Sequence, residues 1–513
     1  MNVLLVNPNR EQMPWPVVPV GLCTVASALR RAGHDVDVLD LTFSRDLRRD
    51  VTTRVRERCP ELVGLTIRNI DNCNFEAPHF YLTEIRDEVV RALRESGSTA
   101  PVVVGGSAVN VSPGDTLRYL EADYALVGEG EEALVELAGA LENKRGIHGV
   151  KGLLEPGRGS TKPLPVLDTG RLLRGEPPNG RAVVHDFASS ARSEAYRWVD
   201  LSKYAAQGGP YPIQSKRGCA LKCSYCVYNN IEGHAYRLRR AREVLDEIEE
   251  AVEHGVRAVD FVDSTFNLPL SHARDLCEEL ARRALPVELS TMGLNPAGVT
   301  PELVQAMKRA GFKSVMCTPE SAAEATLAGL NKGFKKHAVV RAARALGQAG
   351  IPTYWFFMLG APGETLETVR ETLAFCDEHI PKTDMVLFST GIRVYAGTPL
   401  ERTCKDMGWF AEDDPLFFPS WFLSPGLELG ELYSLLMRAA ETHPNWMMNA
   451  ETIVSPRRAA MMKSAFRMLG WKGPFWKHLP KMFAWAGRVG VRQRGLRVHR
   501  ENLARVTNVQ HRS

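Results

Sequence analysis

Three cysteines stand within the ten-residue stretch Arg217-Gly218-Cys219-Ala220-Leu221-Lys222-Cys223-Ser224-Tyr225-Cys226, spaced C-x3-C-x2-C. The other seven cysteines are scattered singly along the chain. Thiolates this close together on a loop can converge on one metal centre. Structural zinc sites and ordinary iron–sulfur carriers usually have four protein ligands. Three thiolates therefore favour a [4Fe–4S] cluster with one iron open to a small chelating molecule. A zinc loop with a distant fourth ligand, or three unrelated thiols, is the alternative.

This loop resembles the signature of a known family. C-x3-C-x-(aromatic)-C, with Tyr225 as the aromatic residue, is similar to the cluster-binding loop of radical S-adenosylmethionine (SAM) enzymes. The resemblance implies that Cys219, Cys223 and Cys226 hold a [4Fe–4S] cluster. It also implies that the open iron binds the amino and carboxylate groups of SAM, and that Tyr225 lies near the adenine.

The size and composition indicate a protein with two or three domains. The chain has 513 residues, of which 44% are hydrophobic and 24% charged, as in a soluble globular protein. A net charge of +4 gives no general case for nucleic-acid binding. The first residues do not have the layout of a signal peptide, and no apolar run approaches the roughly 20 residues that span a bilayer. Free thiols suit a reducing interior, so we expect a cytoplasmic protein. We also expect a monomer that does not contact a membrane.

Residues 1–145 have the pattern of a doubly wound, Rossmann-like parallel sheet. Apolar strand patterns at 3–6, 36–39, 62–67, 102–104 and 124–127 alternate with helical stretches. Ligands of such sheets bind at the carboxyl ends of the strands. Glycine-rich turns follow the last two of these strands, at 105–107 and 128–131, where they could let the backbone approach a ligand or simply form tight turns. No G-x-G-x-x-G follows the first strand, so a dinucleotide is not indicated.

The order of these motifs resembles the cobalamin-binding domain that precedes many radical SAM domains. Pro19-x-Gly21, Gly33-His34-Asp35-Val36 and the two glycine-rich turns carry the resemblance. No D-x-H-x-x-G motif is present, so no histidine is placed to bind cobalt. Arg68, which leaves the third strand, is the candidate for the lower cobalt face, the alternative being a solvated or salt-bridged arginine. The resemblance implies a cobalamin site formed by Arg68, Asn69, Gly105, Gly106, Ser107, Gly128, Glu129 and Gly130.

A second α/β unit follows a connecting segment. Residues 146–205 are rich in Gly, Pro and Arg and are expected to pack at the domain junction. Residues 206–405 show six strand patterns separated by helices, which predicts a partial (β/α)6 barrel related to the TIM barrel, with its chemistry at the carboxyl ends of the strands. The strand patterns lie at 213–215, 259–262, 287–292, 314–317, 353–359 and within 385–395.

Polar residues at these strand ends match the radical SAM pattern. The resemblance implies that SAM is contacted by Tyr225, Asp263, Asn267, Glu320, Ser321 and Arg393. For Asp263 and Glu320 the alternative role is helix N-capping, which a carboxylate at such a position can equally serve.

The last hundred residues are irregular and rich in aromatic residues. We expect residues 406–513 to form a mainly helical cap, including helices with Met-rich faces at Met447-Met448 and Met461-Met462, which could hold substrate specificity. From Trp471 onward ten Lys and Arg residues accompany one acid, Glu501. Such a run could bind nucleic acid or an acidic carrier, but it is more often a solvated chain end.

Together these features predict an α/β enzyme that uses both cofactors. We expect a cobalamin-dependent radical SAM C-methyltransferase, in which the methyl group passes from SAM through methylcobalamin to a carbon of a small, specialised metabolite. An external low-potential electron donor would be its partner. The alternatives are a non-methylating cyclisation, ring contraction or oxidation with the same cofactors, a nucleic-acid-modifying enzyme, and a cobalamin sensor without catalysis.

Overall fold

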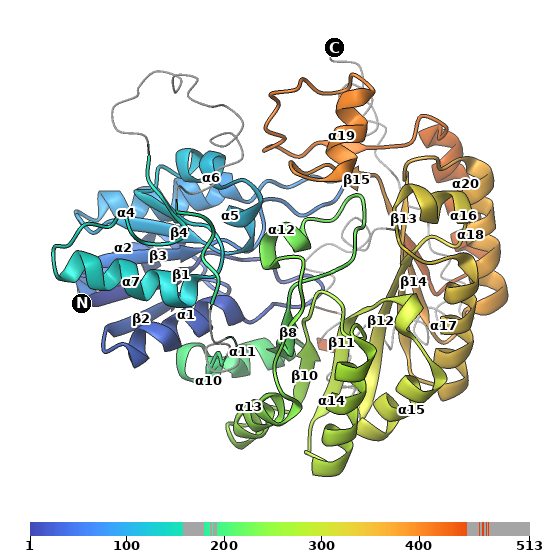
Figure 1. Ribbon diagram of the computed structural model, residues 1–513, viewed down its shortest axis with the longest axis horizontal. Coiled ribbons are helices and arrows are strands. Elements are labelled where there is room, and N and C mark those ends of the chain that lie inside the picture. The colour runs from blue at the N-terminus through green and yellow to red at the C-terminus, as the bar shows by residue number, and fades with distance from the viewer. Residues whose placement is uncertain are drawn as a thin grey trace.

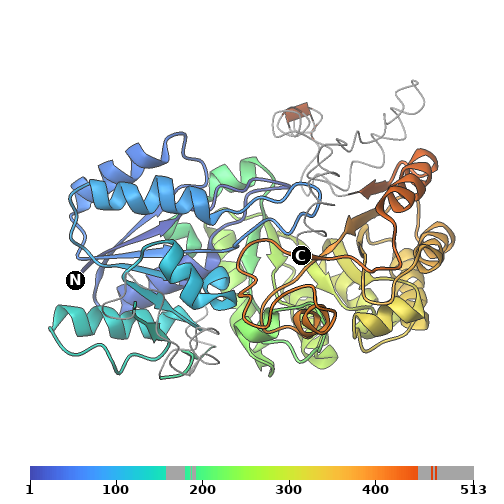
Figure 2. The ribbon, with the colours of Figure 1, turned by 90° about the horizontal axis from the view of Figure 1, so that it is seen from above.

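A computed structural model describes residues 1–156, 179–184, 187 and 192–448, together with positions 461, 464, 465, 468 and 470. Met462 and the basic run from Trp471 onward lie outside the described residues. Two α/β units lie side by side, each built around its own sheet (Figure 1; Figure 2). The short helix α12 (Tyr228–Glu232) and strand β8 (Lys216–Arg217) lie between them (Figure 1).

The N-terminal sheet has the strand order β2-β1-β3-β4-β5-β6. All five predicted strands are confirmed, and they run parallel. The sixth strand pairs antiparallel with β5 and was not predicted, because two residues give no periodic signal. The strands are β1 (Asn2–Asn7), β2 (Asp35–Asp40), β3 (Leu62–Thr66), β4 (Val102–Gly105), β5 (Tyr124–Leu126) and β6 (Leu153–Leu154).

Successive side chains along each strand point to opposite faces of this sheet, so a hydrophobic core forms on each face. Leu5 belongs to the core that contains Leu22 of α1 (Val20–Arg31) and Leu134 of α7 (Gly130–Glu142). Its neighbour Leu4 belongs to the core that contains Val51 of α2 (Leu47–Arg58). The remaining helical segments of this unit are α3 (Leu82–Glu84), η1 (Ile85–Val90), α4 (Arg91–Glu95), α5 (Ser107–Val111) and α6 (Pro113–Tyr119).

The second sheet is parallel throughout, with the order β17-β14-β13-β12-β11-β10-β7. Five of the six predicted strand regions are confirmed, whereas the strand predicted at 213–215 lies at Tyr211–Ile213 and shares only Ile213 with the prediction; β7 and β17 form the two edges of the sheet. The strands are β7 (Tyr211–Ile213), β10 (Ala258–Phe261), β11 (Glu288–Leu294), β12 (Phe312–Glu320), β13 (Thr353–Leu359), β14 (Met385–Thr390) and β17 (Trp446–Met448).

The prediction of a helix at Met447-Met448 is wrong. Helix α20 (Leu429–Thr442) ends before them, and Trp446–Met448 pairs with Val386–Phe388 of β14. The open edge of β14 offers unpaired backbone groups, so pairing there outweighs the weak helical preference of two methionines.

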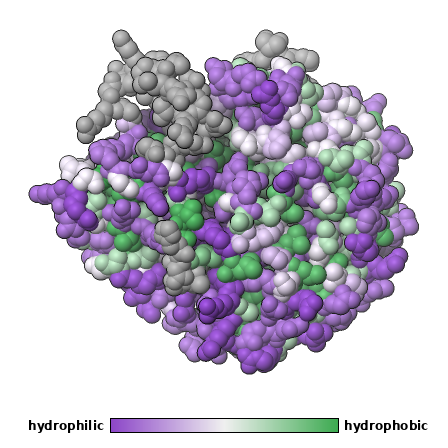
Figure 3. All heavy atoms as spheres, in the orientation of Figure 1, coloured by the Kyte–Doolittle hydropathy of each residue, from purple (hydrophilic) through white to green (hydrophobic). Residues whose placement is uncertain are grey.

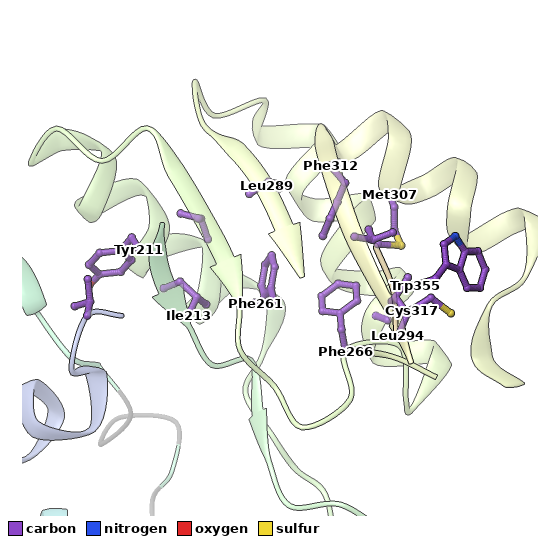
Figure 4. Packing of buried hydrophobic residues seen from close by; sticks show 14 of the residues in the cluster. Tyr211, Ile213, Phe261, Phe266, Leu289, Leu294, Met307, Phe312, Cys317 and Trp355 are labelled. Carbon is purple, nitrogen blue, oxygen red and sulfur yellow. The ribbon is translucent and has the colours of Figure 1, made fainter. Parts of the chain in front are cut away.

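Helices cover the outer face of the second sheet, and alternate strand residues point toward them. Phe261, Leu289, Phe312 and Trp355 all lie in this layer (Figure 4). The residues between them therefore face the concave side, which is the lumen of the partial barrel. The covering helices are α13 (Ala241–Glu253), α14 (Leu270–Arg283), α15 (Pro301–Ala310), α16 (Glu324–Gly329), α17 (Lys336–Ala349) and α18 (Leu366–His379).

The described part of the C-terminal region consists of α19 (Pro399–Asp406), α20, and the antiparallel pair β15 (Ile392–Arg393) and β16 (Trp421–Phe422). Among the described residues no helix is long and apolar enough to cross a membrane. On the face in Figure 3, hydrophobic residues form small groups between hydrophilic ones.

Candidate functional site

The cysteine loop is shaped by a short hairpin. Strand β8 pairs antiparallel with β9 (Arg237–Leu238), and the loop runs between them through α12. Gly218 begins the loop with a φ of +92°, and a Cβ atom there would come within 2.0 Å of the carbonyl oxygen of Ala235. Only glycine fits, so the residue before the first cysteine fixes the path of the loop.

The three cysteines line one cavity of about 460 Å³. Cys219 and Cys223 are buried and Cys226 is partly buried. No three His, Cys, Asp or Glu side chains of the described residues are grouped tightly enough for one metal ion. Burial raises the pKa of Cys226 to about 12 and also raises that of Cys223, so these thiols need a positive centre to ionise.

A strained, buried carboxylate lies across this cavity. Glu320 ends β12 with a φ of +66° and is 5% exposed. Its Oε1 accepts hydrogen bonds from the Tyr225 hydroxyl (3.0 Å) and the Lys332 ammonium (3.5 Å). Its Oε2 is buried without a hydrogen-bond partner. Burial raises the pKa of Glu320, although Lys332 opposes that effect. A buried oxygen without a partner, on strained backbone, is typical of a site that receives a hydrogen-bond donor from a ligand.

The other residues predicted to bind SAM have different surroundings. Asp263 lines the cavity, but it is also paired with Lys216 at 3.2 Å and accepts from Ser215. The side chains of the remaining three are bonded within the protein and do not line this cavity: Asn267 with Asn295, Ser321 with Thr372, and Arg393 with Asp71. Their assignment to SAM stays a prediction.

A second cavity, of about 350 Å³, lies at the carboxyl edge of the N-terminal sheet. It is lined by seven of the eight residues predicted to bind cobalamin: Arg68, Gly105, Gly106, Ser107, Gly128, Glu129 and Gly130. Asn69 lines a neighbouring pocket instead, which it shares with Arg68. The cysteine cavity and this sheet-edge cavity share wall residues, among them Arg68 and the half-exposed Tyr228, so they adjoin each other.

The glycines at the sheet edge serve two purposes. A Cβ atom on Gly106 would lie 2.6 Å from the carbonyl oxygen of Ile67, and one on Gly128 would lie 2.1 Å from that of Ala182. These two glycines are therefore required for close packing of the chain itself. A Cβ on Gly105 would meet nothing nearer than 4.0 Å, which leaves that part of the edge open. The open space beside Gly105 is where a ligand could approach the backbone at this edge of the sheet.

Ion pairs join the two cavities. Arg217, beside the first cysteine, contacts Glu131 at 2.6 Å and Glu129 at 3.1 Å. Arg237 of β9 also pairs with Glu129. Burial alone would raise the pKa of Glu129, but hydrogen bonds from Arg237 and the charge of Arg217 hold it below its usual value. The cysteine hairpin is thus fastened to the second glycine-rich turn.

Three residues at this site were missed by the analysis of the sequence. Lys332 follows α16, and Arg217 precedes Cys219 by two residues. The sequence does not indicate which carboxylate either side chain pairs with. Tyr228 is near enough to the cysteines to have been suspected, since it lies two residues beyond Cys226. For Lys332 and Arg217 the signal is tertiary, whereas for Tyr228 it is the closeness to Cys226 in the sequence.

Comparison with known proteins agrees with this geometry. The B12 binding domain family matches residues 13–138, and the Radical SAM superfamily matches residues 213–376. The tryptophan 2-C-methyltransferase of Streptomyces laurentii is 28% identical over 449 residues, which cover 76% of this chain and 72% of that protein. An anaerobic magnesium-protoporphyrin IX monomethyl ester cyclase of Synechocystis is 26% identical over 373 residues, covering 68% and 67%.

Solved structures are similar over almost the whole chain. The radical SAM methyltransferase TsrM from Kitasatospora setae, with cobalamin and a [4Fe–4S] cluster bound, superposes with a TM-score of 0.78 at 26% identity, covering 96% of this chain and 99% of that one. The cobalamin-dependent enzyme OxsB, at 16% identity and a TM-score of 0.68, covers 99% of this chain and 78% of that one and shows the shared fold. The chain therefore carries a B12-binding domain at residues 13–138 ahead of a radical SAM domain at residues 213–376, the arrangement expected from the sequence.

Proposed function

We propose that this chain is a cobalamin-dependent radical SAM C-methyltransferase, which moves a methyl group from SAM, by way of bound cobalamin, to a carbon of a small molecule. One observation carries the proposal: the cysteine cavity and the sheet-edge cavity share a wall, so two cofactors held in them would face each other. Similarity to a methyltransferase over nearly the full length of both chains supports it.

Each cofactor has a set of residues that could hold it. Cys219, Cys223 and Cys226 would bind the cluster. Tyr225, Glu320 and Asp263 would contact SAM, with Lys332 positioning Glu320. Asn267, Ser321 and Arg393 remain proposed SAM residues, although their side chains are bonded within the protein. The seven predicted residues of the sheet-edge cavity would hold cobalamin, and Arg68 among them also lines the cysteine cavity. These sets correspond to domains at 1–145 and 206–405, joined by residues 146–205 and followed by a cap at 406–513.

When bound, the cluster supplies an electron to SAM and cobalamin supplies a carrier for its methyl group. The chain places the two cofactors and excludes water from the space between them. Glu320 presents a buried acceptor oxygen, and Lys332 balances its charge. Arg217 and Arg237 pair with Glu131 and Glu129 and so fix the cysteine hairpin against the edge of the N-terminal sheet. Both cavities are formed by one chain, so a monomer would suffice, served by an external low-potential electron donor.

The test is the fate of a labelled methyl group. The anaerobically reconstituted enzyme is incubated with methyl-deuterated SAM, a reductant and L-tryptophan, which is the substrate named for one relative. We expect a product that carries one labelled methyl group on carbon. The Cys223→Ser variant, which should lack an intact cluster, is the matched control and should form none.

A second candidate function rests on similarity to a cyclase. The magnesium-protoporphyrin cyclase of Synechocystis covers a comparable share of this chain. A reaction of that kind would give an oxidised or cyclised product without the label, accompanied by 5′-deoxyadenosine. Formation of S-adenosylhomocysteine together with a labelled product would exclude it.

A further inference from the structure

The cysteine loop reaches the protein surface between its first two cysteines. Cys219 and Cys223 are buried, yet their neighbours Ala220 and Lys222 are exposed. The carbonyl oxygen of Lys222 accepts a hydrogen bond of 2.6 Å from the side-chain amide of Asn331, which fastens the loop to the segment before α17. Two of the proposed cluster ligands are therefore next in sequence to residues that a partner molecule can contact.

Helix α17 begins close to this point, and its amino end is basic. Lys335 is the N-cap residue, Lys336 and His337 begin the first turn, and the whole helix contains no acidic residue. Backbone N–H groups give this end of a helix a partial positive charge, so basic side chains there are unfavourable. The carboxylate of Glu324, which accepts from the Lys336 backbone N–H at 3.0 Å, offsets part of that charge. An arrangement that costs stability favours a role in binding over a role in folding.

These positive charges have few counter-charges nearby in the chain. The side chains of Lys222, Lys335 and Arg341 form no ion pair with any of the described residues. Between residues 218 and 242 the one acidic residue is Glu232, which lines the sheet-edge cavity and accepts a backbone hydrogen bond of 3.1 Å there. The loop and the start of α17 thus form one basic surface, here named the loop rim, which consists of Lys222, Lys335, Lys336, His337 and Arg341.

We infer that the loop rim is the docking surface for a small, acidic, one-electron carrier protein. The inference rests on the proposed function, in which the cluster receives an electron from outside the chain. In this step the carrier loses one electron and the oxidised cluster gains it, and no bond is made or broken. A carrier on the loop rim contacts the residues beside two cluster ligands, so the path of the electron is short. Opposite charges steer such an encounter, and a small polar interface suits a contact that must separate after each transfer.

The test compares a protein reductant with a small one. The holoenzyme with SAM is mixed anaerobically with fully reduced flavodoxin, an acidic one-electron carrier, and formation of the flavin semiquinone is followed by stopped flow. Lys222→Gln combined with Lys335→Gln should lower the second-order rate constant about tenfold at low ionic strength. The difference should shrink in high salt, because mobile ions screen surface charges. Reduced methyl viologen, a small cation that needs no docking surface, should reduce both proteins at the same rate.

Lys313→Gln combined with Lys382→Gln is the matched control. Both lysines are exposed and lie near the amino ends of β12 and β14, whereas the cysteine loop follows the carboxyl end of β7. The same loss of charge at this opposite end of the barrel should leave the flavodoxin rate unchanged.

Equal flavodoxin rates in the two double variants would overturn the inference, as would an equal loss of rate with methyl viologen in the loop-rim variant. Binding of RNA by the wild type that the loop-rim variant loses, with its flavodoxin rate unchanged, would assign the surface to nucleic acid and also overturn it. Failure of the wild type to assemble a four-iron cluster would instead overturn the proposed function, and the inference with it.

Discussion

The sheet-edge cavity and the cysteine cavity adjoin each other, yet different kinds of residue line them. The sheet-edge cavity includes glycines at 105, 106, 128 and 130, of which Gly106 and Gly128 let chain segments pack closely, together with larger apolar side chains and the ion-paired Glu129, Glu131 and Arg217. The cysteine cavity is lined by buried thiols, a strained carboxylate and a buried ammonium group. The glycine positions of the sheet edge depend on backbone conformation, whereas the cysteine cavity depends on the balance of its buried charges.

This difference determines what each region tolerates. A glycine edge depends on backbone conformation, so an added methyl group damages it while changes of charge matter little. In a cluster of buried charges each charge is neutralised by a neighbour of opposite sign. Removal of one side chain therefore leaves a buried charge without its counter-charge. The four predictions below test this contrast. The first also tests whether cobalamin binds when the cluster is absent.

The largest effect is expected from Cys223→Ser. Loss of one of three thiolate ligands should prevent an intact four-iron cluster and abolish product formation, whereas cobalamin should still bind, because the sheet-edge cavity is unchanged. Iron, sulfide and cobalamin are measured after reconstitution. Cys59→Ser, at an exposed thiol that follows α2, is the control and should keep all three. A full four-iron cluster in the Cys223 variant would remove this residue from the ligand set.

The next effect is expected from Lys332→Met. This change leaves Glu320 buried and without its cation, which should cost about 4 kcal/mol of the free energy of unfolding. Adding Glu320→Gln should recover most of that loss, since the uncompensated charge is then gone. Denaturant titration under anaerobic conditions measures both variants. Equal stability of the single and double variants would show that charge is not what holds this cavity together.

The contrast also explains which parts of the fold and of the site could be predicted from the sequence. Strands β1 and β3 to β5 were predictable because each is a mostly buried, apolar run bounded by turns, and β2 and most barrel strands were predictable because apolar residues recur along them between turns. The glycine-rich turns and the cysteine triplet were found because their residues are neighbours in the chain. Both kinds of signal are local.

What was missed depends on tertiary contacts. Strand β17 exists because β14 has an open edge, and nothing in Trp446-Met447-Met448 itself indicates it. Lys332 meets Glu320, and Arg217 meets Glu131, only after the sheets have formed. The same reason applies to Arg393, whose guanidinium pairs with Asp71 of the other domain, 322 residues away in sequence.

A smaller effect is expected where the two regions join. Arg217→Gln removes the cation between Glu129 and Glu131 in a nearly buried pair and should cost about 3 kcal/mol of the free energy of unfolding. Arg237→Gln offers a matched comparison, because Arg237 contacts the same Glu129 with a side chain that is 27% exposed, and should cost about 1 kcal/mol or less. Equal losses in the two variants would mean that burial does not set the strength of this junction.

The smallest effect is expected at the glycine edge, and it has the opposite origin. Gly106→Ala places a Cβ 2.6 Å from the carbonyl oxygen of Ile67 on backbone with a φ of +100°, which should cost about 2 kcal/mol of the free energy of unfolding. Gly21→Ala, in helix α1 with no atom near its Cβ, should instead stabilise the protein by about 0.5 kcal/mol. Thermal unfolding of the cobalamin-free protein separates this backbone strain from any loss of ligand. Because neither change alters charge, both variants should keep the full iron content of the wild type, and a loss of iron in Gly106→Ala would show that the shape of the sheet edge also governs the cysteine cavity.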